Sequence, residues 1–148
     1  MGNQVVVTTL IVEDNPSFRV SLKEILAARF PQMAVNEAGS SEEALERMES
    51  LRPDLMFVDI RLPGRNGLEL TRQVRKDDTE VVIVILTNHD LPEFREAAYQ
   101  YGVDYFFSKS TSTMEEILAA VEAILRRKVE AGVSLERSPQ DPVARGLN

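Results

Sequence analysis

Five short apolar runs alternate with segments of helical periodicity, and this alternation restricts the possible folds more than any other feature of the sequence. The runs cover residues 5–12, 33–38, 55–58, 81–86 and 105–107. They are mostly continuous, which is typical of strands buried on both faces. In the segments that follow each run, apolar residues recur every three or four positions, as in helices with one buried stripe. Strict alternation of strand and helix predicts right-handed crossovers and one parallel sheet covered on both faces, a doubly wound α/β fold.

Local signals indicate where the helices begin and end. Asn15 followed by Pro16 predicts an N-cap with a first-turn proline, and Ser40 with Glu43 predicts a capping box. The basic residues at 126–128 are expected at the end of the last helix, where positive charge interacts favourably with the helix dipole. These signals support a helical interpretation of the segments between the apolar runs.

Length and composition indicate one globular domain. A chain of 148 residues without cysteine is long enough to form a core without disulfides. We expect this domain over residues 1–128 and a flexible C-terminal tail over residues 129–148. The longest aliphatic run, residues 81–86, is far shorter than the roughly 20 residues that cross a bilayer, so we expect a cytoplasmic protein without membrane contact. The net charge of −7 disfavours direct binding of nucleic acid.

Polar side chains stand at the points where four of the apolar runs end. They are Glu13 and Asp14 after the first run, Asp59 after the third, Thr87 after the fourth, and Ser108 and Lys109 after the fifth. Each of them alone is better explained as a turn former, a helix cap or an exposed lysine. In doubly wound sheets, however, ligands gather at the carboxyl ends of the strands. We therefore expect these side chains to converge on one site.

The charges of this expected site indicate its chemistry. Two carboxylates about 4 Å apart repel by roughly 4 kcal/mol at an effective dielectric constant of 20. A hard divalent cation, Mg²⁺ or Mn²⁺, suits such a set of oxygen ligands, which contains neither His nor Cys. A cation beside Thr87 and Lys109 is typical of phosphoryl transfer. Asp59 is the only carboxylate at the central strand end, so we expect it to be the nucleophile that forms an aspartyl phosphate.

Four segments that contain these residues resemble the receiver domain of two-component response regulators. They are LIVEDN, FVDIRLPGRNGLEL, VILTNHD and DYFFSKS, in this order. The resemblance covers residues 5–128. The receivers in question either stand alone or are attached to a helix-turn-helix output domain. It implies a flavodoxin-like (βα)5 fold whose five-stranded parallel sheet has the order 2-1-3-4-5.

The resemblance also implies roles for the residues at the strand ends. Asp59 matches the phosphoacceptor, and Lys109 matches the lysine that contacts the phosphoryl group. Asp14 matches the acid that coordinates the metal directly, whereas Glu13 matches an outer acid that acts largely through water. Arg61 stands at the position whose backbone carbonyl completes the metal shell.

Two further positions match the residues that switch conformation in the family. Thr87 matches the switch hydroxyl and Phe106 the aromatic switch position. At the rim of the site, Arg61, Asn88 and His89 are expected to tune the access of water and so the lifetime of the phosphoryl group, although a purely solvated role for Arg61 and His89 is an equal alternative.

The sequence departs from the usual family pattern at several positions. Glu13 stands where Asp is more common, which adds one methylene, and Asn88 stands where a small Ala or Gly is usual. Ser110 replaces a common proline, so the cis peptide that often follows the lysine is not expected. Phe106 lacks the hydroxyl of a tyrosine, so its switching has to depend on packing.

The resemblance predicts a phosphorylation-dependent signalling switch. A histidine kinase or phosphotransfer protein would donate a phosphoryl group to Asp59 in the presence of Mg²⁺. The face built from the segments near 94–101, 105–107 and 114–125 would then change its preference for a protein partner or for a second copy. On this reading the chain is not an enzyme and catalyses only its own phosphorylation and dephosphorylation.

Two alternatives stay open at this point. A receiver-like scaffold would bind partners without phosphorylation, for which Asn88 and Ser110 are weak indications. An Mg²⁺-dependent phosphohydrolase of the aspartyl-phosphate type would need an acid two residues after its nucleophile, where this chain has Arg61.

Overall fold

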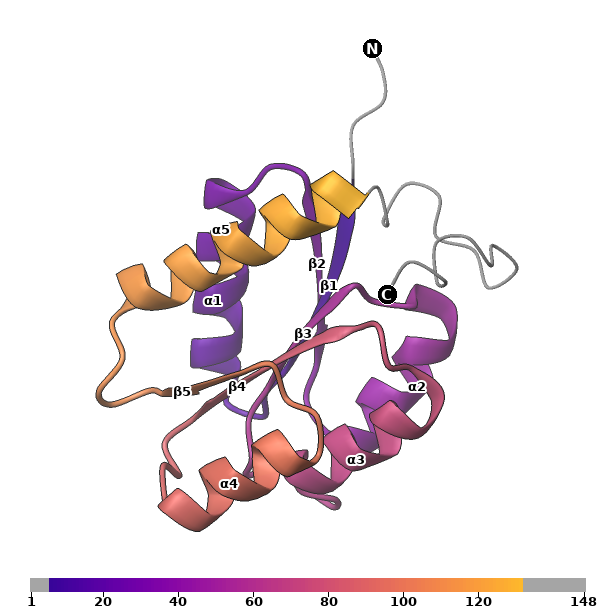
Figure 1. Cartoon of the computed structure of the whole chain (residues 1–148), viewed down its shortest axis with the longest axis vertical. Helices are drawn as coiled ribbons and strands as arrows, with labels where there is room; N and C mark the ends of the chain where they lie inside the picture. Colours follow the sequence, from indigo (N-terminus) through magenta and orange to yellow (C-terminus); the bar gives the residue numbers. More distant parts are fainter. Residues whose placement is uncertain (1–5, 132–148) are drawn as a thin grey trace.

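A five-stranded parallel sheet forms the centre of this computed structural model, which describes residues 6–131 (Figure 1). The strands are β1 (Val7–Val12), β2 (Met33–Ala38), β3 (Leu55–Val58), β4 (Val82–Thr87) and β5 (Tyr105–Ser108). Their order across the sheet is β2-β1-β3-β4-β5, and every neighbouring pair is parallel. The flavodoxin-like topology and the predicted strand order are both confirmed.

Two strands extend further toward their carboxyl ends than the apolar runs predict. β4 includes Thr87 and β5 includes Ser108, and these two residues are partners in the β4–β5 register. The pairing then continues through a hydrogen bond of 2.8 Å from the Lys109 N–H to the Thr87 carbonyl. Backbone pairing does not depend on an apolar side chain, so the sheet carries these polar residues to its edge in regular strand geometry.

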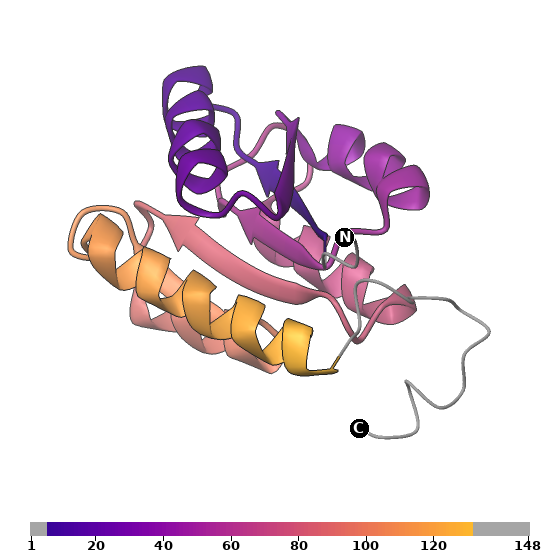
Figure 2. The same ribbon diagram turned by 90° about the horizontal axis from the view of Figure 1, so that it is seen from above.

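Two helical layers cover the sheet, as Figure 2 shows. α1 (Pro16–Arg29) and α5 (Met114–Ala131) pack on one face. α2 (Ser41–Leu51), α3 (Gly67–Asp77) and α4 (Pro92–Gln100) pack on the other. Each helix turns its apolar stripe to the sheet, which leaves the polar side chains in solvent.

The core consists of two apolar clusters separated by the sheet. Met56, Ile83 and Ile85 face the layer of α2, α3 and α4, whereas Phe57 and Val84 face α1 and α5. All five side chains are at most 1% exposed. Successive side chains of a strand point to opposite faces, so a strand buried on both sides must be apolar at every position. This explains why the runs at β3 and β4 are continuous.

Caps at the helix starts agree with the sequence signals, with one difference. Asn15 Oδ1 accepts a hydrogen bond of 3.1 Å from the Phe18 N–H, and Ser40 Oγ accepts one of 3.1 Å from the Glu43 N–H. The Glu43 carboxylate, however, accepts from the Gly39 N–H at 2.8 Å, one residue earlier than a capping box requires. Both caps satisfy backbone donors that the first helical turn leaves without partners.

The last helix is longer than predicted. α5 continues to Ala131, three residues past the domain boundary that we predicted at residue 128. Residues 129–131 therefore extend the helix, and the remainder of the predicted tail lies outside the described residues. Among the described helices, none is long and apolar enough to span a bilayer.

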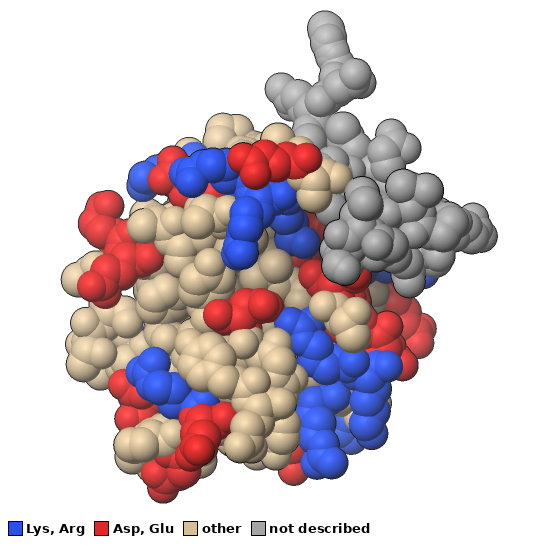
Figure 3. All heavy atoms as spheres, viewed as in Figure 1, with Lys and Arg blue, Asp and Glu red and all other residues tan. Residues whose placement is uncertain are grey.

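Charged side chains are unevenly spread over the surface. On the face shown in Figure 3, Lys and Arg gather at the lower right, where Figure 1 places α2 and α3. The exposed basic residues of α3 and of the loop before it are Arg61, Arg65, Arg72 and Lys76. The absence of direct nucleic-acid binding stays a prediction from the net charge.

Candidate functional site

Three carboxylates lie together at the carboxyl edge of the sheet. Glu13 and Asp14 follow β1, and Asp59 follows the neighbouring strand β3. One oxygen of each carboxylate lies within 4.8 Å of the other two. Glu13 and Asp59 are buried, whereas Asp14 is exposed. The three side chains that were predicted as metal ligands are therefore brought together.

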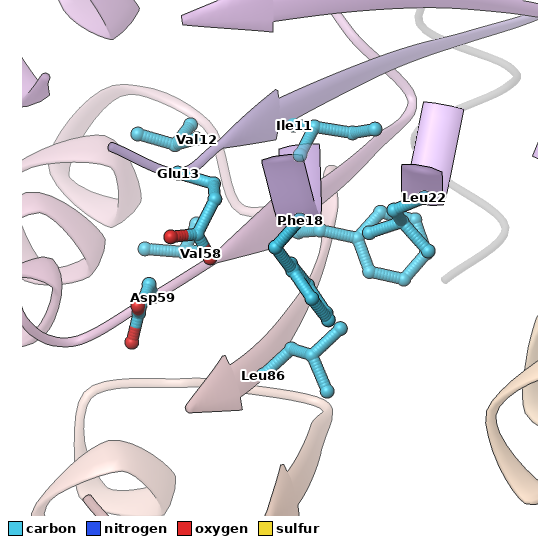
Figure 4. A pocket seen from close by; sticks show the side chains of 9 residues that line it. Ile11, Val12, Glu13, Phe18, Leu22, Val58, Asp59 and Leu86 are labelled. Carbon is cyan, nitrogen blue, oxygen red and sulfur yellow. The ribbon is translucent and has the colours of Figure 1, made fainter. Parts of the chain in front are cut away.

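Backbone pairing past the strand ends holds these acids in place. The Glu13 N–H donates to the Ala38 carbonyl at 3.0 Å, and the Asp59 N–H donates to the Val12 carbonyl at 3.1 Å. Both acids thus extend the hydrogen-bonded sheet by one residue. Figure 4 shows the carboxylates of Glu13 and Asp59 side by side.

The ammonium group of Lys109 reaches this cluster from the end of β5. Its Nζ lies 2.7 Å from Glu13 Oε1 and 3.3 Å from Asp59 Oδ2. The lysine side chain is only 11% exposed. One positive charge thus bridges two buried carboxylates, and Lys109 lies at the site where the sequence predicts it.

Burial raises the pKa of the Glu13 carboxyl above its ordinary value. Hydrogen bonds from Lys109 and from the Asn15 N–H act in the opposite direction, and the nearby charge of Asp59 adds to the rise. Burial is the largest of these effects, so keeping the Glu13 carboxyl ionised costs free energy. An additional cation would reduce this cost.

Asp59 carries an oxygen without a partner. Among the described residues, two buried side-chain polar atoms lack a hydrogen bond, Asp59 Oδ1 and Thr9 Oγ1. A buried acceptor left unpaired costs about 1 to 3 kcal/mol, and a cation bound among these acids would offset that cost. The donors are all carboxylate oxygens, which Mg²⁺ and Mn²⁺ prefer. The residues present therefore fit a hard divalent cation.

Thr87 lies at the end of β4, between the strands that carry Asp59 and Lys109. Its side chain is fully buried. Oγ1 accepts a hydrogen bond of 3.1 Å from the His89 N–H. A hydroxyl has a proton to donate as well as lone pairs, so this bond leaves Thr87 able to donate to a group on Asp59.

Phe106 is buried in β5 and is covered by Arg95 of α4. The ring is 5% exposed, and the Arg95 guanidinium carbon lies 4.6 Å from its centroid. Arg95 also pairs with Asp90 at 2.8 Å and donates to the Phe106 carbonyl at 3.4 Å. The predicted aromatic switch residue therefore points inward in this structure, and the Arg95 guanidinium lies over its ring.

The remaining predicted residues lie at the rim. The side chains of Arg61 and Asn88 are exposed, and His89 is half-buried. The metal contact of the Arg61 carbonyl and the crowding by Asn88 stay predictions. The peptide bond after Lys109 is trans, and Ser110 Oγ lies 3.1 Å from Ser108 Oγ.

Two residues that the sequence does not indicate, Arg19 and Glu37, support Glu13. Arg19 of α1 donates to the Glu13 carbonyl at 2.8 Å and to Glu37 of β2 at 2.8 Å. Lys23 also contacts Glu37 at 3.1 Å, and these two cationic donors lower the Glu37 pKa. The spacing of Arg19 and Lys23 on one helix face is visible in the sequence, but their acidic partner on another element is not.

A small pocket adjoins the acidic cluster. Glu13 and Asp59 border it on one side, and Phe18, Leu22 and Leu86 form part of its apolar wall (Figure 4). The two carboxylates thus border an apolar wall, which contributes to their burial.

Comparison with known proteins gives consistent matches. The family model described as the response regulator receiver domain matches residues 9–122. The chain is similar to the response regulator MprA of Mycobacterium bovis (strain BCG / Pasteur 1173P2), with 32% identity over 96% of this chain and 63% of that protein. It spans 50% to 63% of the length of the curated relatives it matches.

Solved structures give the same result. A LuxR-family two-component response regulator from Aurantimonas sp. SI85-9A1 is 32% identical, with a TM-score of 0.75 over 82% of this chain and 86% of that one. The response regulator TrrA from Thermotoga maritima, solved in complex with Mg²⁺-BeF, is 29% identical. Its TM-score is 0.71 over 80% of this chain and 99% of that one.

Proposed function

This chain belongs to the response regulator receiver domain family of two-component systems, and we propose that Asp59 is the residue that accepts its phosphoryl group. The observation that carries the proposal is the buried Oδ1 of Asp59, which has no hydrogen-bond partner. It belongs to a carboxylate whose other oxygen lies 3.3 Å from the Lys109 ammonium. A nucleophile with one free oxygen beside a fixed positive charge suits the attack on a phosphoryl group.

The donor in this proposal is a phosphohistidine of a histidine kinase or phosphotransfer protein. A bond forms between a carboxylate oxygen of Asp59 and phosphorus, the N–P bond of the phosphohistidine breaks, and the histidine nitrogen keeps the electron pair. Lys109 offsets charge on the transferred oxygens, and Thr87 donates a hydrogen bond to one of them. These contributions are electrostatic and positional, as is usual in phosphoryl transfer.

The proposed metal ligands are Glu13, Asp14, Asp59 and the backbone carbonyl of Arg61. A bound Mg²⁺ or Mn²⁺ would neutralise negative charge on the phosphoryl oxygens and on the carboxylates. The exposed Asp14 would hold the cation directly, whereas the buried Glu13 would act largely through water. The Mg²⁺-BeF complex of the related TrrA supports the same chemistry here.

The proposed readout begins at Thr87 and passes to Phe106. When Thr87 donates to the phosphoryl group it moves toward Asp59, and the packing around the inward-pointing Phe106 ring changes with it. Phosphorylation then increases the population of the conformation in which the face formed by α4, β5 and α5 binds a protein partner or a second copy. The chain acts on no substrate other than its own phosphoryl group, and we propose a cytoplasmic location for it.

Intact mass after incubation with acetyl phosphate and Mg²⁺ tests the proposal. We expect one phosphoryl adduct that maps to Asp59 and does not form when Mg²⁺ is chelated before the incubation. Asp59→Asn is expected to abolish the adduct and to keep the circular dichroism of the wild type. Asp77→Asn is the matched control, because Asp77 is exposed at the end of α3.

Two results of this experiment would overturn the proposal. An adduct that persists in Asp59→Asn would place the acceptor elsewhere. No adduct and no binding of beryllofluoride would favour a scaffold that binds partners without phosphorylation. Continuous turnover of a small phosphoester would instead favour a phosphohydrolase.

A further inference from the structure

The ring of Phe18 lies against the ammonium group of Lys109. Nζ is 4.1 Å from the ring centroid, within the distance at which the negative face of an aromatic ring attracts a cation. Phe18 lies in the first turn of α1, and its N–H donates to the Asn15 cap. The contact thus joins the start of α1 to the end of β5, and no motif in the sequence indicates it.

The contact completes the surroundings of the ammonium. A lysine ammonium has three N–H donors, and two partners here are Glu13 Oε1 and Asp59 Oδ2. The Phe18 ring is a third partner, and the lysine side chain is only 11% exposed. Water therefore has little access to the ammonium, and a lost contact is poorly replaced by solvent.

The two carboxylates do not hold the ammonium equally. Nζ is 2.7 Å from Glu13 and 3.3 Å from Asp59, so the ion pair with Glu13 is the closer one. A flexible lysine held by Glu13 alone is free to rotate away from Asp59. The ring restricts this motion, because it contacts the ammonium from the α1 side.

The ring is itself held firmly. Phe18 packs against the apolar cluster that includes Leu22 and Leu86, and all three residues line the pocket beside the acids (Figure 4). Because these neighbours already fix the ring, the contact with the ammonium costs the Phe18 side chain little further conformational freedom.

We propose that Phe18 is a positioning residue for Lys109: its ring keeps the ammonium between Glu13 and Asp59, within reach of a phosphoryl group on Asp59. The contact with a phosphoryl group rests on the proposed function. The restraint on Lys109 does not, because it concerns the protein without any ligand.

The test compares Phe18→Leu, which removes the ring and keeps an apolar side chain, with Phe18→Tyr, which keeps the ring. Val20→Ala is the control, since Val20 is exposed on the same helix. The first readout is the NMR order parameter of the Lys109 ε-methylene in the metal-free protein, with the exposed Lys76 as internal reference. The second is the affinity for beryllofluoride in the presence of Mg²⁺, measured by calorimetry.

In Phe18→Leu we expect the Lys109 order parameter to fall toward that of Lys76. The beryllofluoride affinity is expected to fall about three- to thirtyfold, the range that corresponds to one cation–π contact. Phe18→Tyr and Val20→Ala are expected to keep both values. If Phe18→Leu is poorly folded, Phe18→Met removes the ring with another flexible apolar side chain and takes its place.

Two outcomes would overturn the inference. In the first, Phe18→Leu leaves the Lys109 order parameter unchanged. In the second, Phe18→Tyr lowers the Lys109 order parameter as far as Phe18→Leu does, which would show that the ring is not the cause. If the wild type itself fails to bind beryllofluoride, the proposed function is wrong, and the order parameter alone still decides whether Phe18 positions Lys109.

Discussion

The ammonium of Lys109 lies 2.7 Å from Oε1 of Glu13, although 96 positions separate the two residues in the sequence. The longer side chain of glutamate lets the carboxylate reach this ammonium while its other oxygen accepts from the Asn15 N–H. Both Glu13 oxygens thus accept a hydrogen bond within the protein. The carboxylate of Glu13 therefore joins the ammonium at the end of β5 to the backbone at the start of α1.

Removal of Lys109 is expected to destabilise the metal-free protein by about 3 kcal/mol, because loss of one partner of a buried ion pair leaves the other charge uncompensated. Mg²⁺ is expected to restore part of the loss, since a ligand that binds only the folded state stabilises it by mass action. Urea unfolding of Lys109→Ala with and without Mg²⁺ measures both effects. Lys76→Ala serves as the control, because Lys76 is exposed. Equal stability losses in the two variants would contradict this role of Lys109.

Gly67 is expected to be irreplaceable, because it opens α3 against the backbone of Asp59. A Cβ on Gly67 would lie 2.0 Å from the Asp59 carbonyl oxygen, and the Gly67 N–H donates to the Ile60 carbonyl at 2.7 Å. We expect Gly67→Ala to lower the free energy of unfolding by about 3 kcal/mol through overpacking, and to shift the Asp59 amide resonance. Denaturant unfolding and amide spectra measure these effects.

Gly39 provides the matched control for this change. A Cβ there would meet its nearest atom, in the Arg19 side chain, at 3.5 Å, which is an ordinary contact. Gly39→Ala is expected to change the free energy of unfolding by less than about 1 kcal/mol. If the two variants were equally stable, the close approach of Gly67 to Asp59 would not restrict that position.

The positions of Asp59 and Thr87 were predictable because each follows an apolar run directly. A strand buried on both faces is mostly apolar, so a charged or polar side chain directly after it marks its end, and the ends of parallel strands meet at one edge. The order of the strands is not local information, so it followed from the resemblance to receiver domains. The helix bounds followed from caps such as Asn15, which act on their own neighbours.

The contacts between distant side chains were not predictable in this way. Phe18 belongs to the apolar stripe of α1, and periodicity places it on the inner face but does not say that Lys109 meets it there. In the same way, Arg95 reads as an ordinary charged residue of α4, although it covers Phe106. Such pairs depend on the packing of one element on another, for which a single sequence carries no periodic signal.

Arg95 is expected to hold Phe106 in its inward position. Arg95→Met keeps the length of the side chain and removes both the cation above the ring and the pair with Asp90. We expect the inward form to lose about 1 kcal/mol, so that Phe106 becomes more accessible to a paramagnetic cosolute in NMR spectra. Arg72→Met is the control, since Arg72 stacks on Tyr101 instead. Unchanged accessibility of Phe106 in Arg95→Met would show that packing alone holds the ring.

The cluster around Glu37 is expected to give a stability difference that depends on pH. Arg19 and Lys23 hold the Glu37 pKa below its ordinary value of 4.5, so the folded state binds fewer protons there than the unfolded state. Its stabilisation is therefore complete above pH 4.5 and is lost as the pH falls through the lower, folded-state pKa. Because the two ion pairs are partly exposed, we expect Glu37→Gln to cost about 1 kcal/mol at pH 7.

Urea unfolding of the wild type and of Glu37→Gln at a series of pH values measures this difference directly. It should stay constant from pH 7 down to pH 5 and shrink below the ordinary value of 4.5. Glu24→Gln is the control, because Glu24 is exposed on α1 and its replacement should have little effect at any pH. Arg19 also donates to the Glu13 carbonyl, so Glu37→Gln should weaken Mg²⁺ binding at pH 7 if Glu37 orients that arginine. A Glu37→Gln variant that loses stability equally at pH 7 and pH 3 would show that the ion pairs contribute nothing and that only packing was disturbed.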